Sequence, residues 1–559
     1  MTARIFPGQN SSLRLLLLKN LSVSALIFAL LEFWRPLYFL TDDNLGGAFP
    51  QLTEIGQRLA GGKSPFISGY IFNGNYNLLR DASSCWHPIY LLASLLANTP
   101  AHFLIVDAAA FSLFMLATAG FVHLAHFLRS ELDLKLSDAR LMLYSLSFTY
   151  SMIVLTTGSS WVTFLGNHSA LPWLALGILQ TSWRKGLGLV TLFSIHHILG
   201  GYLAATISDS IFFSLFAAGV AFTRRSLIPL FSWTAGFGVA ILVLVPLLVP
   251  AGQGFLDADR AEGLTAAKMS QFAVPASLLP LSYFFGVFSS LLPMRMGFGA
   301  CQVYYSSAFV SCAAAWALVP AMLSRARWRP LEMLCLGLVA ILTVMVIRPL
   351  WISEIMIHLP VLKSMRWPFR EILQLQFFLH LFLVLRPLGG TVPFQRKITA
   401  ISIFIFLFPW LFLPAPTFYG MHMDRQLLFS GRANRYWDRV KTLLGPDDCL
   451  VPVADPALIN NRNYQLEIPF TLLGAYDFPI LFKVKSATGY SIVAPRDQLY
   501  LHTAPAINIG IFSPDQKQAI LQERPGVRFI TLESVEPLRI TLSTPNRPPI
   551  DLTPYIPPE

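Results

Sequence analysis

Long apolar runs recur along the chain from Leu13 to Leu413, and short polar clusters separate them. Many of the runs are about 17–25 residues long, the length of a helix that crosses the hydrocarbon core of a bilayer. A large soluble protein can be somewhat apolar, but it would not repeat such uninterrupted runs. We therefore predict a mainly α, polytopic membrane helix bundle over residues 1–413, with about eleven transmembrane helices.

The first apolar run follows Arg4, Arg14 and Lys19 and continues to about Leu40. It is too long for the core of a cleaved signal, and no small-residue cleavage site follows it. We expect it to be the first membrane helix, retained in the mature protein.

The pattern changes after Pro414-Ala415-Pro416, where the composition becomes that of an ordinary soluble domain. We predict a soluble domain of α/β or α+β class over residues 414–559. The elements expected in it are a helix at Arg425–Leu444, strands at Cys449–Val453, Ile480–Val484 and Val527–Leu532, and an extended tail at Pro545–Glu559.

Composition supports a membrane protein and argues against nucleic acid as a partner. Hydrophobic residues make up 54% of the chain and charged residues 13%, whereas a soluble chain is about 25% charged. The net charge is +11, but the basic residues stand in short clusters at the ends of apolar runs. Two spans separate one cluster from the next, so a single assignment places all of them in the cytoplasm. The chain then starts inside and ends outside.

Two long loops fall on the outer side in this topology. The first covers about residues 41–101 and contains a predicted surface helix at Pro50–Leu59, and the second covers about residues 251–303. Loops without a function are usually short, so these two are where chemistry is expected. Cys85, Cys301 and Cys449 share this face, and one disulfide among them is compatible with the sequence, with the pair left open.

Two adjacent acids, Asp42 and Asp43, stand where the first predicted helix emerges on the outer face. A carboxylate there could take a proton from an acceptor hydroxyl or amine, or the pair could help to hold a divalent cation such as Mg or Mn near a phosphate. The alternative is a polar helix end that only meets water.

A basic cluster, Arg366-Trp367-Pro368-Phe369-Arg370-Glu371, lies at the outer end of the tenth predicted span, where the topology rule does not expect arginines. The planar fork of arginine donates two hydrogen bonds to one phosphate, and a helix N-terminus favours an anion. Arg366 and Arg370 are therefore candidate phosphate ligands. The alternative is interfacial snorkelling, with Trp367 in the aromatic belt.

Other polar residues give weaker signals. Glu54 and His87 are expected to line a cavity on the outer face, but no metal-ligand spacing such as HExxH appears. Asp107 and Asp209 fall inside apolar stretches, which hints at function, although Asp107 is close enough to the end of its helix to reach the interface. The sequence has no P-loop, dinucleotide-binding glycine pattern or nucleophile elbow, so an ATP-driven pump is not expected.

The order of these features resembles the GT-C superfamily of membrane glycosyltransferases, and more closely the YfhO-like bacterial membrane proteins. The matching features are an acid after the first helix (Asp42 or Asp43), a Gly-x-x-Pro stretch at residues 62–65, Trp86-His87-Pro88, Tyr304-Tyr305, and an R-x-P-x-R pattern at residues 366–370. The resemblance covers about residues 20–385. It departs from many GT-C enzymes in having Asp-Asp-Asn rather than Asp-Glu after the first helix, which leaves open which acid is catalytic.

The resemblance implies an inverting glycosyltransferase in the bacterial cytoplasmic membrane, with an extracytoplasmic C-terminal domain. It would move a hexosyl or pentosyl group from a polyprenyl-phosphate-linked donor to a glycan, lipid or protein acceptor. Asp42 or Asp43 would be the base, Arg366 and Arg370 would bind the donor phosphate, and Trp86, Tyr304 and Trp367 would line the cavity with Glu54 and His87. The alternatives are a transporter or flippase for lipid-linked glycans, and a non-catalytic assembly protein.

Overall fold

The computed structural model describes residues 7–72, 76–78, 86–256, 265–270, 273, 318, 320–324, 326–359, 362–364, 368–386, 393–397, 400–401, 421–455, 458, 468–489, 503–504, 509–544 and 547–558. Internal contacts divide the chain into two units. The first, here called the bundle unit, contains residues 1–38, 109–248 and 263–414. The second, here called the loop–sheet unit, contains residues 39–108, 249–262 and 415–559.

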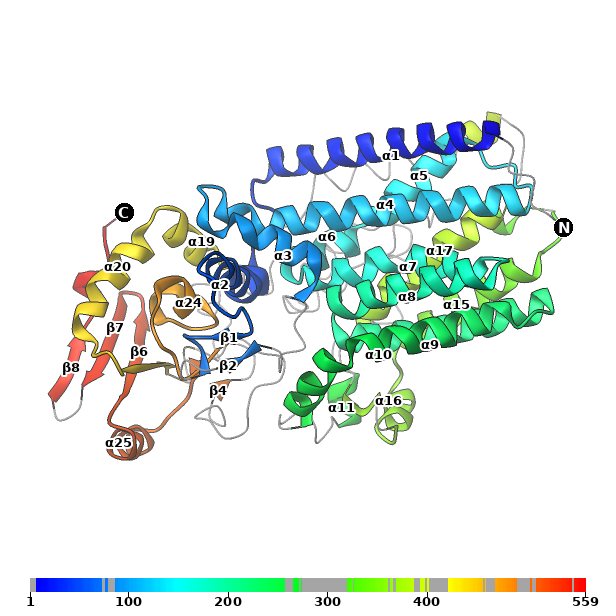
Figure 1. Cartoon of the computed structure of the whole chain (residues 1–559). Helices are drawn as coiled ribbons and strands as arrows, with labels where there is room; N and C mark the ends of the chain where they lie inside the picture. Colours follow the sequence, from blue (N-terminus) through cyan, green and yellow to red (C-terminus); the bar gives the residue numbers. More distant parts are fainter. Residues whose placement is uncertain are drawn as a thin grey trace. The chain divides into compact units, whose positions relative to one another are not determined.

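Within the described residues, six helical segments are long and apolar enough to cross a membrane: Ser12–Trp34, His102–Glu131, Asp138–Ser160, Ala205–Arg224, Ile228–Gly254 and Pro330–Ile347. They belong to α1 (Pro7–Trp34), α4 (Ile105–Glu131), the pair α5 (Asp138–Thr149) and α6 (Met152–Ser160), α9 (Leu203–Arg224), α10 (Ile228–Leu256) and α15 (Pro330–Ile347) (Figure 1). The mainly helical architecture is confirmed, and the number of about eleven spans stays a prediction.

Several of these helices present large apolar side chains that the protein itself does not cover. Phe33 of α1 is 86% exposed and Leu242 of α10 is 72% exposed. Water would make such continuous apolar faces costly, whereas lipid solvates them without penalty. The helices therefore indicate a membrane protein.

Among the described residues, further helices of the bundle unit include α7 (Thr163–Leu179), α8 (Trp183–Gly200), α11 (Ala266–Met269), α16 (Leu350–Met356) and α17 (Ile372–Leu385), with 3₁₀ turns at Leu362–Ser364 and Pro368–Glu371. Helices α7 and α8 approach closely because Gly166 has no side chain. A Cβ there would lie 1.8 Å from the carbonyl oxygen of Gly200. Small residues allow this kind of helix contact in membranes.

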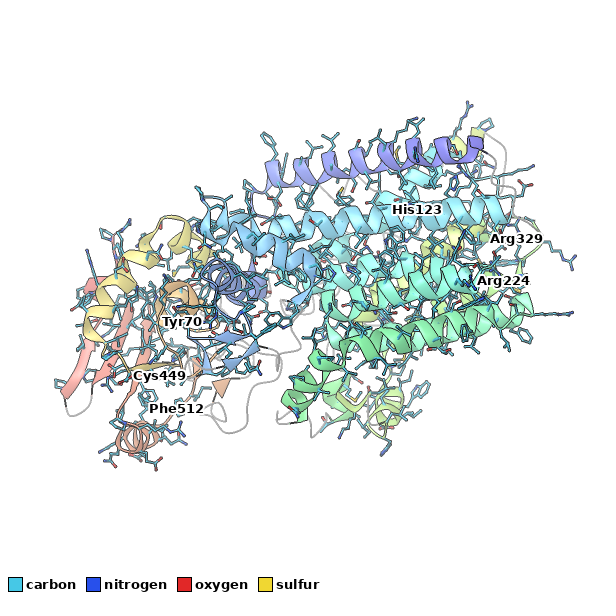
Figure 2. The ribbon with its side chains drawn as sticks, in the orientation of Figure 1. Tyr70, His123, Arg224, Arg329, Cys449 and Phe512 are labelled. Carbon is cyan, nitrogen blue, oxygen red and sulfur yellow. The ribbon has the colours of Figure 1, made fainter. Side chains whose placement is uncertain are left out.

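Two arginines of the basic clusters occupy the same end of the bundle unit. Figure 2 shows Arg224 at the end of α9 and Arg329 at the start of α15. Arg224 donates to the carbonyl oxygen of Leu179, the last residue of α7, at 2.6 Å. This gathering agrees with the pattern used to orient the chain, and which side of a membrane it faces stays a prediction.

The first part of the loop–sheet unit is built by the predicted first outer loop. It contains a π-helix at Asn44–Ala48, α2 (Phe49–Ala60), β1 (Ile67–Ser68), β2 (Tyr76–Asn77), α3 (Pro88–Ser94) and 3₁₀ turns at Leu95–Asn98 and His102–Leu104. The helix predicted at Pro50–Leu59 is confirmed as α2, but the prediction that it lies on the surface is wrong for most of its length. Most of its first two turns are buried, so it is a packed element of this unit.

The C-terminal part contributes a mixed sheet, which has the strand order β4-β5-β3-β6-β7-β8 in the described residues. Its strands are β3 (Cys449–Ala454), β4 (Thr503–Ala504), β5 (Ile509–Gly510), β6 (Val527–Val535), β7 (Leu538–Thr544) and β8 (Arg547–Asp551). Strand β3 pairs in parallel with β5 and β6, and the other pairs are antiparallel. Val451, Val453 and Phe529 form the core of one face, against α25 (Pro514–Glu523).

Three of the predicted C-terminal elements are confirmed at least in part. The strands at Cys449–Val453 and Val527–Leu532 are β3 and β6. The extended tail includes β8, followed by a 3₁₀ turn at Thr553–Tyr555.

Two predictions in this region need correction. The predicted helix at Arg425–Leu444 is interrupted, because Gly431 takes a left-handed conformation between α19 (His422–Phe429) and α20 (Arg432–Val440). The predicted strand at Ile480–Val484 is wrong. These residues belong largely to α24 (Phe478–Phe482), which has proline in its first turn and follows α23 (Phe470–Leu473).

Candidate active site

The two candidate acids lie in a tight turn of residues 41–44, here called the acid turn. Asp42 is fully buried and has a positive φ of 50°, while Asp43 is partly exposed and precedes the π-helix. Aspartate tolerates the left-handed region better than most residues, but the conformation is still strained and persists only when its surroundings impose it. A buried carboxylate in such a position is a feature that active sites often have.

Hydrogen bonds to the preceding backbone hold the acid turn in place. The Asn44 side chain donates through Nδ2 to the carbonyl oxygen of Phe39 at 2.9 Å, and the backbone N–H of Leu45 donates to Thr41 at 3.2 Å. The backbone N–H of Phe39 donates to Oδ1 of Asp107 at 3.0 Å.

Asp107 therefore has a structural role in the fold. The alternative from the sequence, that it only reaches the membrane interface, does not describe it fully. It is buried, with 3% of its surface exposed, and it fixes the chain three residues before Asp42. The only sequence signal for this role was a carboxylate inside an apolar run.

The other predicted residues of the first loop serve local structure. Glu54 is buried and accepts from Ser68 Oγ at 2.6 Å and from the backbone N–H of Gly69 at 2.9 Å. Burial raises the pKa of the Glu54 carboxyl, while these hydrogen bonds act in the opposite direction. Trp86 packs against Phe66, with ring centroids 4.6 Å apart.

His87 is the N-cap of α3. Its Nδ1 accepts from the backbone N–H of Ile89 at 3.1 Å, and burial lowers its pKa to about 4. The ring is thus neutral near pH 7, as a hydrogen-bond acceptor requires. Whether Glu54, Trp86 or His87 also borders a substrate stays a prediction.

In the bundle unit, Arg370 stands just before α17 in a cage of aromatic rings. Its Cζ lies 4.2 Å from the ring centroid of Tyr202, 5.0 Å from that of Phe164 and 5.6 Å from that of Trp161. Trp161 and Tyr202 belong to the turns that join α6 to α7 and α8 to α9, and Phe164 is the second residue of α7. An arginine with 9% exposure is held here by ring faces, so the alternative of interfacial snorkelling does not describe it.

Glu371, the residue after Arg370, pairs with a different arginine, Arg348. Glu371 accepts from Nη2 of Arg348 at 2.6 Å, and both side chains are buried. Glu371 therefore has its own cationic partner beside the cage.

A third polar cluster joins α8 and α9 inside the same unit. His197 Nε2 lies 2.7 Å from Oδ2 of Asp209, and the two side chains are 1% and 3% exposed. The backbone carbonyl of His197 accepts from Thr206, which in turn accepts from Asn167 at 3.0 Å. Asp209 thus has a histidine partner within the bundle, which the sequence did not reveal.

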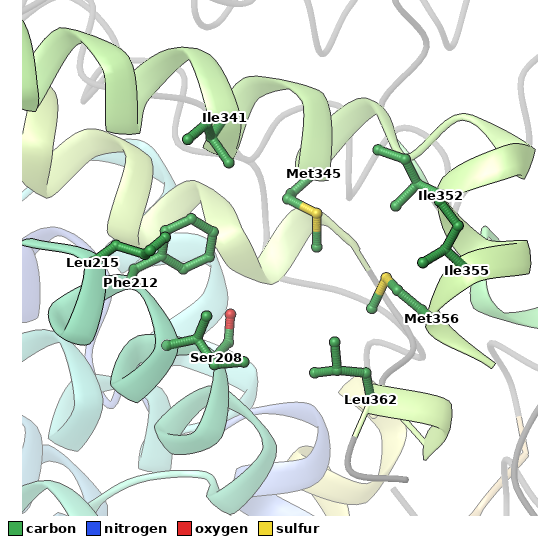
Figure 3. Close-up of a pocket in the computed structure, with 10 residues that line it drawn as sticks. Ser208, Phe212, Leu215, Ile341, Met345, Ile352, Ile355, Met356 and Leu362 are labelled. Atoms are coloured by element: carbon green, nitrogen blue, oxygen red, sulfur yellow. The ribbon is translucent and has the colours of Figure 1, made fainter. Parts of the chain in front are cut away.

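An apolar cavity of about 280 Å³ opens in the bundle unit between α9, α15 and α16 (Figure 3). Its walls include Phe212 and Leu215 of α9, Met345 of α15, and Ile352 and Met356 of α16, with Leu362 at one end. Ser208 also borders the cavity, and its hydroxyl lies 3.4 Å from Oε1 of Gln374 on α17. The lining suits a hydrocarbon chain.

Some predicted features lie outside the described residues. These are Arg366, Trp367, Tyr304, Cys85, Cys301 and most of the second outer loop. The phosphate-binding role of Arg366, the disulfide and the roles of Trp367 and Tyr304 stay predictions. In the part of the chain that the structure describes, no three His, Cys, Asp or Glu residues gather in a way that could hold a metal ion.

Comparison of the chain with protein-family profiles, with curated proteins and with solved structures finds no significant match.

Proposed function

We propose that the protein is a membrane glycosyltransferase of the GT-C kind, closest in its motifs to the YfhO-like bacterial membrane proteins. It would transfer a sugar from a polyprenyl-phosphate donor to an acceptor on the outer face of the cytoplasmic membrane. The observation that carries the proposal is the buried Asp42 carboxylate, held in a left-handed turn soon after the first candidate membrane helix.

The acid turn supports a role in proton transfer. Burial of Asp42 and the adjacent, more accessible Asp43 provide two carboxylates in different environments. A base at this point would be held in position by the hydrogen bond that Asn44 donates to the carbonyl oxygen of Phe39 and by the one that Asp107 accepts from the N–H of Phe39. Positioned bases of this kind contribute about 10²–10⁴-fold to a reaction rate.

The aromatic cage supports a role for Arg370 in holding the donor phosphate. The rings surround the guanidinium, whose planar fork can donate two hydrogen bonds to one phosphate. Because Arg348 pairs with Glu371, the carboxylate next to Arg370 in the chain already has a cation of its own. Arg366 would be the second phosphate ligand.

The apolar cavity supports a lipid-linked donor. It lies between α9 and α15, two of the candidate membrane helices, and the exposed side chains at its rim include Leu215 and Ile341. In this proposal the apolar cavity holds part of the polyprenyl tail.

The reaction would be a single inverting displacement. Asp42 or Asp43 takes the proton from the acceptor hydroxyl or amine, whose oxygen or nitrogen forms a bond to the anomeric carbon. The bond from that carbon to the phosphate oxygen breaks, and its electron pair stays on the polyprenyl phosphate. Arg366 and Arg370 stabilise the negative charge that develops there.

A divalent cation such as Mg or Mn is compatible with this scheme but is not required by it. Asp42 and Asp43 would supply two carboxylate ligands, and oxygens of the substrate would complete the shell. When bound, the ion would neutralise charge on the phosphate leaving group.

The test is transfer from radiolabelled polyprenyl-phospho-sugars by the purified protein. The variants Asp42→Asn and Asp43→Asn should insert normally, and one of them should lose transfer by at least about 100-fold. If both variants keep full transfer, the mechanism is wrong.

One observation favours a second candidate, a transporter or flippase for lipid-linked glycans. His197 and Asp209 form a buried ionisable pair on two bundle helices, and such pairs often mark proton or substrate pathways. In this case His197→Ala would abolish movement of a fluorescent lipid-linked sugar across proteoliposomes, while Asp42→Asn and Asp43→Asn would not. The glycosyltransferase proposal expects no such movement in the wild type, and it expects loss of sugar transfer in one of the two aspartate variants rather than in His197→Ala.

A further inference from the structure

The segment that follows α23 makes a direct connection to the π-helix that begins after Asp43. The backbone N–H of Asp477 donates to the carbonyl oxygen of Gly46 at 2.9 Å. The side chain of Asp477 accepts from Nε2 of Gln51, on α2, at 2.8 Å. Both side chains are buried, with Asp477 at 0% and Gln51 at 3% exposure.

Gly46 leaves room for this contact. A Cβ at Gly46 would lie 3.1 Å from the ring of Tyr476 and 3.2 Å from Cε of Met421. Such distances are tighter than most side-chain contacts, so a Cβ at residue 46 would make the ring of Tyr476 or the end of Met421 shift by a few tenths of an ångström. Tyr476 itself has a positive φ of 52°, a costly conformation for a non-glycine residue that persists only when the surrounding structure imposes it.

Two more backbone bonds keep the same segments together. The N–H of Ser486 donates to the carbonyl oxygen of Tyr70 at 2.7 Å, and the N–H of Phe72 donates to that of Thr488 at 3.3 Å. Residues 476–488 therefore hold the first loop at two points, one beside the acid turn and one beyond α2.

From these contacts we propose that Asp477 is a positioning residue for the acid turn, so that the C-terminal domain completes the active site without touching the substrate. A single residue bonds both to the π-helix and to α2, and this fixes the angle at which the chain leaves Asp43. A π-helix is an uncommon element that is frequently found at functional sites. The catalytic part of this inference rests on the proposed function.

The experiment uses the full-length protein in detergent, with Asp477→Ala, Gln51→Ala, the double variant and Asp477→Asn. Hydrogen exchange of the amides at residues 42–48 should be about tenfold faster in each alanine variant. The two changes should be less than additive in the double variant, because they remove the same hydrogen bond. Asp477→Asn keeps a side-chain oxygen for Gln51 and should restore the slow exchange. Asp438→Ala, at a carboxylate that is 72% exposed in the same unit, is the matched control.

Transfer assays on the same variants separate the two proposals. We expect Asp477→Ala to lower kcat about tenfold, with KM for the donor within about twofold of wild type and with rescue by Asp477→Asn. If exchange at residues 42–48 stays at the wild-type rate in every variant, the positioning role is overturned. If the wild type shows no transfer, the proposed function fails, while the exchange data still decide whether Asp477 holds the acid turn.

Discussion

Arg348 and Glu371 form a buried ion pair, with Nη2 of the arginine 2.6 Å from Oε1 of the glutamate. Each charge depends on the other, because neither side chain has solvent around it. Removing one partner of such a pair costs about 3–5 kcal/mol, since the remaining buried charge loses this ion pair. Glu371→Ala should therefore lower the unfolding temperature in detergent strongly, and Arg348→Met combined with Glu371→Leu should recover most of the loss.

The control for this ion pair is Asp138→Ala. This change breaks the contact between Arg129 and Asp138, whose carboxylate side chain is 69% exposed. An exposed pair is worth about 0–1 kcal/mol, so this variant should melt close to wild type. Equal melting temperatures for Glu371→Ala and Asp138→Ala would contradict the assigned role.

Arg370→Lys should weaken donor binding. Lysine keeps the charge but loses the planar group that stacks on Tyr202, so we expect KM for the donor to rise about tenfold, equivalent to about 1.4 kcal/mol. Tyr202→Leu should act in the same direction. Arg184→Lys is a suitable control, because Arg184 also lies over a ring, that of Trp183, but is exposed. An unchanged KM in Arg370→Lys would exclude the cage as a phosphate site.

Asp107→Ala should loosen the start of the acid turn, because it removes the hydrogen bond that the N–H of Phe39 donates to Oδ1 of Asp107. The loss of such a buried hydrogen bond costs about 1–3 kcal/mol. Faster hydrogen exchange at residues 39–45, with rescue by Asp107→Asn, is the expected result. Glu131→Ala, at an exposed acid at the other end of α4, should change nothing. If both alanine variants behave alike, Asp107 has no positioning role.

Asp424 should make the stability of the protein depend on pH. It is fully buried and accepts at Oδ1 from the N–H and the hydroxyl of Thr471, at 2.6 and 2.7 Å. Burial raises the pKa of this carboxyl to about 7, so the fold favours the protonated form. Its contribution to stability is present below the unfolded pKa of about 4 and is lost as the pH rises through 7.

Thermal unfolding of wild type and Asp424→Asn at pH 5, 6, 7 and 8 tests this. As the pH rises, the unfolding temperature of wild type should fall relative to that of Asp424→Asn. His87 acts in the opposite direction, because its lowered pKa removes stability as the pH falls below about 6.5. Both proteins contain His87, so its contribution cancels in the difference between their unfolding temperatures. A difference that is constant across the four pH values would refute the assignment.

The orientation can be tested by labelling intact cells with a membrane-impermeant maleimide. In a background with the five native cysteines replaced, Asp438→Cys should react and Lys185→Cys should react only after the cells are opened. Both side chains are exposed, so access is set by the membrane alone. The reverse labelling pattern would show that the chain has the opposite orientation in the membrane.

The sequence predicts elements that depend on local pattern. The apolar runs give α1, α4, α9, α10 and α15, and the alternation of β6 and the position of α2 follow from nearby residues. The strand expected at Ile480–Val484 was wrong because a short apolar stretch has no period of its own.

The candidate site depends on contacts that no local pattern contains. Asp107 bonds to Phe39 across 68 residues of sequence, and Gln51 bonds to Asp477 across 426. The rings around Arg370 come from turns near residues 161–164 and 202. A sequence can show which side chains have the chemistry for catalysis or binding, but only the fold shows which of them are in contact.

The loop–sheet unit is assembled from stretches that the ribosome makes far apart in time. Roughly 300 residues separate residue 108 from residue 415, so at about 5–20 residues per second the first stretch waits on the order of 15–60 s for its partner. During that interval Gly46, Gln51 and Tyr70 have none of their C-terminal partners. The acid turn is therefore completed late in biosynthesis, and a chain that stops early would carry its acids in an unfinished loop.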